Sequence, residues 1–248
     1  MGDNLKPRMN FKFNNNNYRF EPKFFSTFVS FLVLLILLSL SLWQLKRLQW
    51  KESLIQQRIN MFESESAVLS NILDPKTQEF LRIKTKGKFI NEMEMFMPAL
   101  SKNGNNGYHI IVPLELSSGE FIIFDRGWVP LRLKDRELRK KNEVSSFHDI
   151  EAVIRLPGKK GKFQPDNDFK NNFWFFVEPT KMSDFTKLNF IENFYLESTI
   201  DGPNGYPLGN QTRIYIRNNH LQYAITWFLI AIGLIGVYIA ANVKKIEN

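Results

Sequence analysis

The sequence contains no cysteine and only three histidines among its 248 residues. The absence of cysteine excludes a disulfide-stabilised secreted scaffold, a cysteine-ligated zinc site and a thiol redox centre. It does not identify the compartment, because reducing and oxidising compartments both hold cysteine-free proteins. The sequence also lacks the usual metalloprotease, serine-hydrolase and dinucleotide-binding motifs. A catalytic site could still be assembled from scattered residues, but no motif in the sequence argues for one.

Charged residues are absent from two long segments, 24–45 and 218–243. Each exceeds the roughly 18 apolar residues that indicate a membrane span, although the mean hydropathy of the whole chain is only −0.26. A cleaved signal peptide is the alternative for the first segment. That reading requires a shorter apolar run and a small-residue cleavage site, whereas Trp43-Gln-Leu-Lys-Arg follows here. We predict transmembrane helices at 24–45 and 218–243 and exclude a freely soluble protein.

The formal charge of +8 concerns membrane topology more than ligand binding. Seven of the 33 basic residues lie in the tails 1–23 and 244–248, and three of the 25 acidic residues do. The segment 46–217 therefore holds 26 basic and 22 acidic residues and is nearly balanced. Short basic tails favour the cytoplasm, while a long domain is translocated largely regardless of its charge. We predict cytoplasmic tails, an extracytoplasmic domain at 46–217, contact with membrane lipid and no nucleic-acid partner.

The tail 1–23 is polar and rich in asparagine, and we predict that it is disordered. It contains Asp3 and Glu21 and lacks the amphipathic arginine and serine pattern of a mitochondrial presequence. This favours the bacterial cell inner membrane as the location, with the central domain in the periplasm.

The segment 46–217 reads as β-rich, because short runs of alternating apolar residues are separated by turn residues. Seven or eight short strands with few helices are typical of an antiparallel barrel or sandwich. The fold class is thus a membrane protein with two transmembrane helices flanking a β-rich α+β domain. The predicted strands lie at 83–89, 93–100, 108–112, 120–125, 149–156, 173–178, 194–197 and 211–216.

Helical spacing appears at three further places. Trp43, Arg47, Trp50 and Leu54 share one helical face, so we expect the first helix to continue past the membrane towards a turn at Asp74-Pro75. Thr180 is placed to cap a short helix that extends to Leu188. Small residues four apart, Gly236 with Ala240 and Ser26 with Ser30, favour close packing of the two spans.

His220 is the histidine with the most informative position, because it opens the second apolar segment. An ionisable group at membrane depth is a functional candidate. Imidazole is a common axial ligand of haem iron, and Ala224, Trp227 and Ala231 follow on the same helical face. A helix cap or an interfacial hydrogen bond is the alternative role, and position alone leaves both open. His109 is expected to be a hydrogen-bonded structural residue and His148 a surface residue.

Four motifs carry a resemblance to a known family. The first, after the first apolar segment, is Trp43-Gln-Leu-Lys-Arg-Leu-Gln-Trp-Lys51. Gly107–Pro113 and Asp125–Val129 follow in the central segment, and Asn218-Asn-His-Leu-Gln-Tyr-Ala-Ile-Thr-Trp-Phe228 opens the second apolar segment. In this order they resemble the signature after the first span, the strand motifs and the second-span signature of the surfeit locus protein family, whose members are assembly factors for cytochrome c oxidase. The resemblance covers residues 43–241.

The resemblance implies a non-enzymatic role in maturing subunit I of cytochrome c oxidase, with haem a as a transiently bound cofactor. Haem a synthase and other assembly factors are the further partners that it implies. The proposed haem contact of the family falls on His220, which becomes the candidate metal ligand. Tyr223 and Trp227 of the same signature are candidate cofactor contacts, and His109 is a weaker one.

Other residues of the resemblance read as structural, namely Arg126, Gly127 and Trp128, while Asp125 stands where the family often has an uncharged residue. Two other classes of function stay open. One is a cofactor-free scaffold for oxidase subunits or assembly factors. The other is a membrane-tethered sensor or enzyme, which the short C-terminal tail and the missing catalytic motifs disfavour.

Overall fold

A computed structural model describes residues 9–13 and 16–246 of the chain. The chain forms two compact units. The first comprises residues 1–54 and 216–248, and the second comprises residues 55–215.

Two long helices dominate the first unit, α1 (Phe24–Glu63) and α3 (His220–Asn242). Both are long and apolar enough to cross a membrane, and only 11% of the apolar window of each is buried. A core helix of a soluble protein would be mostly buried, so the exposed apolar surface fits a lipid environment. The 23 residues of α3 extend about 34 Å, the length of a bilayer core. The first helix also runs past its apolar segment to Glu63, as predicted.

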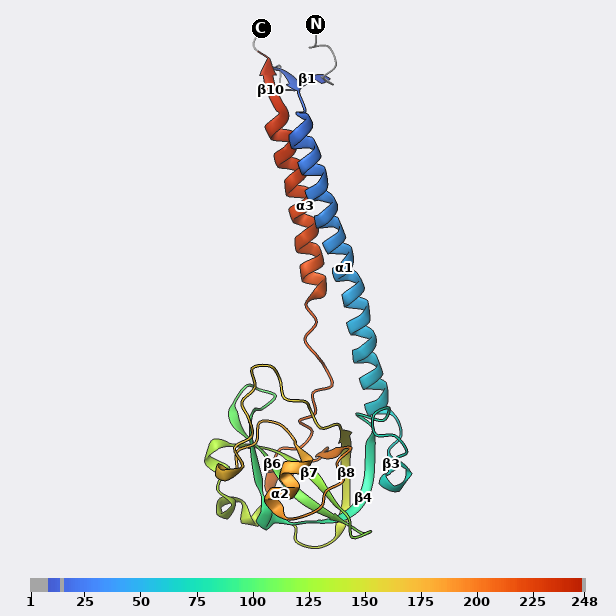
Figure 1. The fold of residues 1–248 in the computed structure, drawn as a ribbon, viewed down its shortest axis with the longest axis vertical. Coiled ribbons are helices and arrows are strands. Elements are labelled where there is room, and N and C mark those ends of the chain that lie inside the picture. Colours follow the sequence, from blue (N-terminus) through green and yellow to red (C-terminus); the bar gives the residue numbers. More distant parts are fainter. Residues whose placement is uncertain (1–8, 14–15, 247–248) are drawn as a thin grey trace. The chain divides into compact units, whose positions relative to one another are not determined.

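The helices α1 and α3 lie side by side and antiparallel (Figure 1). Their contact surface includes several small or polar residues. Ser41 Oγ donates a hydrogen bond to the Ala224 carbonyl at 3.0 Å. Ala224 and Ala231 are 3% and 2% exposed. The predicted contact through Gly236 and Ala240 is wrong, because both are exposed and a Cβ at Gly236 would meet nothing within 4 Å. Two alanines seven residues apart therefore supply the close approach.

A three-stranded antiparallel sheet joins the two chain ends of this unit, in the order β1 (Met9–Phe13), β2 (Asn16–Phe20), β10 (Val243–Ile246). The structure therefore differs from the predicted disorder of the tail 1–23 at residues 9–13 and 16–20, while residues 1–8 and 14–15 lie outside the described part. Asn242 connects the strands to the helices, since its carbonyl accepts from Glu21 N at 2.8 Å and its Oδ1 from Lys23 N at 3.3 Å. The C-terminal strand supplies the hydrogen-bonding partner that an isolated tail would lack.

The second unit is a closed β-barrel, which confirms the predicted fold class. Its five-stranded wall runs β4-β8-β9-β7-β6, and β4 pairs with both β8 and β6 and so closes the ring. The pair β7–β9 is parallel, and the other four pairs of the wall are antiparallel. The strands of the unit are β3 (Ala67–Val68), β4 (Arg82–Phe89), β5 (Met95–Leu100), β6 (Asn106–Leu116), β7 (Phe121–Pro130), β8 (His148–Arg155) and β9 (Tyr195–Ser198).

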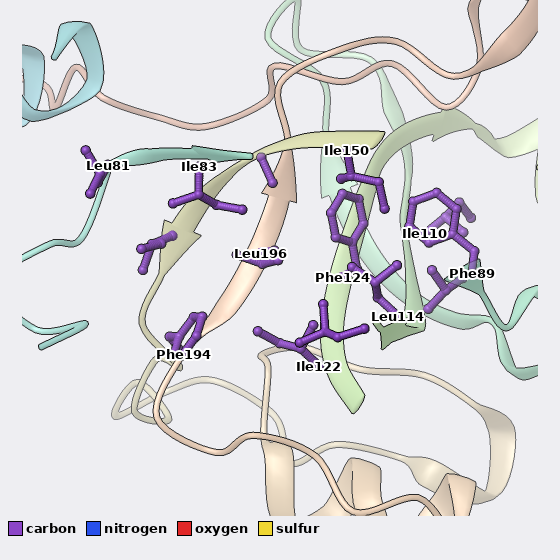
Figure 2. Close-up of a cluster of buried hydrophobic side chains, with 14 of the residues drawn as sticks. Leu81, Ile83, Phe89, Ile110, Leu114, Ile122, Phe124, Ile150, Phe194 and Leu196 are labelled. Carbon is purple, nitrogen blue, oxygen red and sulfur yellow. The ribbon is translucent and has the colours of Figure 1, made fainter. Parts of the chain in front are cut away.

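Alternate residues of the strands fill the barrel, as the period of two requires (Figure 2). Ile110, Phe124 and Leu196 point into this core and are at most 1% exposed. At Gly87 the strand β4 passes from β8 to β6. A Cβ there would lie 2.8 Å from the Glu115 carbonyl oxygen, so glycine allows the crossing.

A second apolar cluster covers the outside of the barrel around Ile111 and Ile123, which are fully buried. The short helix α2 (Pro179–Thr186) and the segment before it contribute Met182 and Trp174 to this cluster. The predicted cap at Thr180 is wrong, because the helix begins at Pro179 and its N-cap is Glu178. Proline suits the first helical position, where no backbone donor is required.

Two of the eight predicted strands do not form. In the segment 173–178 only isolated bridges form, from Phe173 to Phe96 and to Asp168. The amides of Phe175 and Phe176 donate to Asn167 Oδ1 instead of to a neighbouring strand. The segment 211–216 forms no strand either, and Thr212 donates its hydroxyl to Glu197. Both segments pack on the barrel through side chains, so their alternation of apolar residues does not reflect a sheet.

The first helix also ends earlier than the predicted turn at Asp74-Pro75. It stops at Glu63, and the chain then pairs β3 with β4. Arg82 Nη2 donates to the Ser64 carbonyl at 3.1 Å and so ties the helix end to the barrel wall.

Candidate functional site

His220 and Gln44 form the polar contact at one end of the helical hairpin. His220 is the first residue of α3, and its Nδ1 lies 2.6 Å from Gln44 Oε1 on α1. Gln44 is 8% exposed and stands one turn after Ser41 on the seam between the helices. Sequence reasoning missed Gln44, although it belongs to the Trp43–Lys51 motif. The contact spans 176 residues of sequence, so no local pattern indicates it.

This contact assigns the ring nitrogen that donates to Gln44. An amide oxygen only accepts hydrogen bonds, so the Nδ1 of His220 must carry the proton that it donates to Gln44. The Nε2 of the neutral ring then holds the lone pair that coordinates a metal. Metal-ligating histidines almost always donate their other ring N–H in this way, which fixes the ring orientation.

The residues predicted beside His220 do not all face a ligand. Ala224 and Ala231 are buried in the contact with α1 and are not open to a macrocycle, contrary to the role suggested by their shared face. Trp227 is half-buried in the same seam. Tyr223 points away from the seam and is 53% exposed. A flat ligand at His220 would therefore meet the side of the hairpin that carries Tyr223.

Asn218 adds an unsatisfied acceptor two residues before His220. Its Oδ1 is buried and has no hydrogen-bond partner among the described residues. Buried polar atoms are paired in the great majority of cases, so this acceptor is open to a donor from outside the described residues. This end of the hairpin thus presents one imidazole and one buried acceptor.

His109 lies in the barrel unit and forms a buried pair with Asp125. Its Nδ1 is 2.5 Å from Asp125 Oδ2, and the two side chains are 15% and 3% exposed. Burial lowers the pKa of His109, but the adjacent Asp125 carboxylate outweighs this and the net pKa is raised. The expected hydrogen-bonded role of His109 is thus present. Asp125, which stands where the family often has an uncharged residue, is the partner in this hydrogen bond.

Glu197 extends this polar group along the outside of the barrel. It lies opposite Asp125 in the β7–β9 pairing and accepts hydrogen bonds from Tyr195 Oη at 3.0 Å and Thr212 Oγ1 at 2.7 Å. Arg155 Nε lies 3.6 Å from its carboxylate. Burial raises the pKa of Glu197 and the pKa of Tyr195. Within the described residues, no three histidine, aspartate or glutamate side chains form a group that would hold a metal ion.

Gly127 and Trp128 have the structural roles expected of them. Trp128 exchanges two backbone hydrogen bonds of 2.8 Å with Leu208, and its Nε1 donates to the Ala99 carbonyl at 3.1 Å. Gly127 has a φ of +115° and would place a Cβ 2.0 Å from the Leu208 oxygen. Only glycine permits this approach, which holds the segment around Leu208 on the barrel.

The charged stretch 132–141 is more than the solvated loop or short helix expected of it. It contains a short 3₁₀ helix, Arg136–Asn142, whose Arg139 is buried and donates two hydrogen bonds to Glu94 at 3.0 and 2.7 Å. His148 differs from the expected surface residue as well. It is half-buried, with its ring 5.2 Å from Phe89 and its Nδ1 2.9 Å from the Ser146 carbonyl oxygen.

Comparison with known proteins places this architecture in one family. The SURF1 family matches residues 31–232. The chain is 29% identical over 229 residues to Surfeit locus protein 1 of Takifugu rubripes, covering 84% of this chain and 93% of that protein. It is 31% identical over 228 residues to a SURF1-like protein of Rickettsia prowazekii, covering 85% of this chain and 88% of that protein. It is 28% identical over 228 residues to human Surfeit locus protein 1, covering 84% of this chain and 74% of that protein. The match covers the whole barrel and part of each long helix, and the chain belongs to the SURF1 family.

Proposed function

We propose that this protein is an assembly factor for cytochrome c oxidase that holds haem a through His220 and passes it to subunit I. The observation that carries the proposal is the hydrogen bond from His220 Nδ1 to Gln44 Oε1, because it leaves Nε2 to coordinate iron. The family resemblance supports the oxidase context and a role without catalysis. Haem a synthase and other assembly factors are the partners expected to deliver and receive the cofactor.

A carrier needs a site that binds and also releases. A single imidazole ligand and one orphaned acceptor at the edge of a hairpin enclose little of a macrocycle, which favours exchange over permanent retention. Apolar side chains that face the lipid around Tyr223 would meet the ring and keep it away from water. The bound haem would supply its iron and its apolar ring, and the chain would supply orientation.

The absorption spectrum of the protein tests the proposal. The full chain is purified in detergent from cells that make haem a, and its haem content is measured per polypeptide. We expect a haem a spectrum in the wild type and its loss in His220→Ala. Gln44→Leu should also lower occupancy, because the ring loses the partner that fixes its protonation, whereas Gln49→Leu on the exposed side of α1 should not. Colourless wild-type protein, or equal occupancy in His220→Ala, would refute the assignment.

A cofactor-free scaffold is the second candidate, and one observation favours it. Ala224 and Ala231, the small residues that follow His220 on α3, already pack against α1. The hairpin therefore needs no ligand to fill this contact. A scaffold would co-purify with oxidase subunit I while carrying no haem, and His220→Ala would leave oxidase assembly as in the wild type.

We further propose that the protein resides in a bacterial inner membrane with both termini cytoplasmic and the barrel in the periplasm. The basic tails and the long intervening domain support this orientation. Alkaline phosphatase fused within the barrel segment should be active, and the same reporter fused at the C-terminus should be inactive. The opposite pattern would reverse the topology.

A further inference from the structure

The three-stranded sheet at the end of the hairpin (Figure 1) has two unlike faces, and no role so far described uses it. Successive side chains of a strand point to opposite faces, so the register of β1, β2 and β10 determines which residues share a face. One face is mainly apolar and carries Met9, Phe11, Tyr18, Phe20 and Val243, together with Asn16 and Lys245. The other face is mainly polar and carries Asn10, Lys12, Asn17, Arg19 and Lys244, together with Ile246.

Side-chain contacts confirm this division of the sheet. On the apolar face the rings of Phe11 and Tyr18 stack, with their centroids 5.7 Å apart. On the polar face Arg19 Nε donates to Asn10 Oδ1 at 3.2 Å, and Arg19 Nη1 lies 3.5 Å from the Glu21 carboxylate. Polar groups therefore pair with one another on one face, and aromatic rings gather on the other.

The apolar face is only partly covered by the rest of the chain. Met9 is 69% exposed and Phe11 is 42% exposed. The Phe20 ring meets the Tyr238 ring of α3 edge-on, with centroids 6.1 Å apart, so this face adjoins the hairpin. Phe24, the first residue of α1, is 88% exposed at the same end. Exposed apolar surface thus continues from the membrane-spanning helices onto the sheet, where contact with water would be unfavourable.

The connections to the helices determine how far the sheet lies from the membrane core. The strand β10 follows α3 without an intervening residue, and only residues 21–23 separate β2 from α1. The Asn242 carbonyl accepts a hydrogen bond from Glu21 N at 2.8 Å and holds the two connections together. The headgroup layer is about 5–8 Å deep on each side of the hydrocarbon core. Because α1 and α3 span the membrane, strands that start at their ends begin within this layer.

We propose that this sheet is a membrane-surface element, with its apolar face against lipid at the boundary between headgroups and acyl chains and its polar face in water. Phe11 and Tyr18 lie there as aromatic residues of the membrane interface do. Lys245 shares the apolar face, and its long side chain reaches the headgroup phosphates while its stem stays in apolar surroundings. The sheet thereby holds the ends of α1 and α3 at one depth in the bilayer. This role depends neither on the haem proposal nor on which side of the membrane the tails lie.

Spin labels test the role, because the chain has no cysteine and each introduced cysteine carries the only label. Met9→Cys, Asn10→Cys, Phe11→Cys and Lys12→Cys are labelled in turn on the full chain in lipid nanodiscs. Power saturation compares collisions with oxygen, which concentrates in lipid, and with nickel ethylenediaminediacetate, which stays in water. We expect the ratio of oxygen to nickel collisions to alternate and to be severalfold higher at 9 and 11 than at 10 and 12. Phe228→Cys, at an exposed position of α3, gives the reference value for lipid.

Other patterns overturn the proposal. Free access of the nickel complex to all four labels places the sheet in water. Labels at 9 and 11 that are shielded from both reagents mark a protein contact, for example with a second copy of the chain. A double label at Asn10 and Lys244 checks that labelling leaves the sheet intact. The two residues lie on the outer strands, about 10 Å apart, and should broaden each other's spectrum. Loss of this broadening also overturns the proposal, because the amphipathic surface then does not exist in the membrane.

Discussion

Gly127 offers the sharpest test of how the barrel holds the chain that leads to the last helix. A Cβ at this position would lie 2.0 Å from the Leu208 carbonyl oxygen and 2.6 Å from its carbonyl carbon. Backbone atoms cannot give way as a flexible side chain does, so Gly127→Ala must displace Leu208. The displacement breaks the two 2.8 Å hydrogen bonds that Leu208 exchanges with Trp128.

The expected loss of stability follows from these contacts. An alanine at a φ of +115° costs about 1–3 kcal/mol in backbone strain. Two lost backbone hydrogen bonds add about 0.5–1.5 kcal/mol each. The total is about 2–6 kcal/mol of unfolding free energy, a large part of the roughly 5–15 kcal/mol that a domain has. With a urea slope of about 2 kcal/mol per molar, the unfolding midpoint should fall by about 1–3 M.

Pulse proteolysis of the full chain in nanodiscs across a urea series measures this midpoint, because the protease cleaves the unfolded barrel and spares the folded one. Gly119→Ala is the matched control. It also has a positive φ, +84°, but a Cβ there meets nothing within 4 Å, so only strain of about 1 kcal/mol is expected. Equal midpoint shifts in the two variants would refute the reasoning, since contact with Leu208 would then contribute nothing.

Three further substitutions test the buried pairs and the helix seam. The pKa of His109 is raised beside Asp125. The pair therefore stabilises the barrel fully below the pKa of an unfolded histidine, about 6.5, and this stabilisation is lost as the pH rises through the folded pKa. His109→Gln removes the titrating group, so its urea midpoint should change less between pH 6 and 9 than that of the wild type. Arg139→Met leaves the Glu94 carboxylate buried without its partner and should cost about 3–5 kcal/mol by the same assay. Ala231→Leu overfills the contact between α1 and α3 by about 1–3 kcal/mol and should lower the amount of protein in the membrane fraction.

Each of these substitutions has a control at a comparable position. His148→Gln should leave the pH dependence of the urea midpoint as in the wild type. Lys140→Met should leave the unfolding free energy nearly unchanged, because Lys140 is exposed. Gly236→Leu should leave the amount of protein in the membrane fraction unchanged, because Gly236 faces away from α1. A wild-type slope in His109→Gln, a near-neutral Arg139→Met, or equal losses for the two leucine variants would contradict the corresponding argument.

The sequence predicted the spans and most of the barrel strands because local chemistry determines both. A run without charge that spans 20 residues has few alternatives to a membrane helix. Alternation of apolar residues at 108–112 and 149–156 reports one face buried in a core. The same alternation misled at 173–178, since Asn167 supplies acceptors in place of a neighbouring strand. The sequence does not show where those acceptors lie.

The contact face of α3 was beyond sequence reasoning for a related reason. The helix carries small residues on several sides, and each set spaced by four or seven is compatible with close packing. The position of α1 decides which of these sets makes the contact. Ala224 and Ala231 pack against α1, whereas Gly236 and Ala240 stay exposed. The face proposed from the sequence to receive a ligand is the one that packs against α1.

The two alternatives that the sequence left open for His220 turn out to be compatible. The histidine does make an interfacial hydrogen bond, but across the hairpin to Gln44 and through Nδ1 only. Coordination requires the other ring nitrogen, so the structural contact and a haem ligand occupy different atoms of one side chain. The hydrogen bond even favours coordination, because it holds the ring in the tautomer that a metal needs. Two motifs separated by the whole barrel in the sequence thus meet at a single hydrogen bond, and a substitution at Gln44 should weaken any ligand that His220 holds.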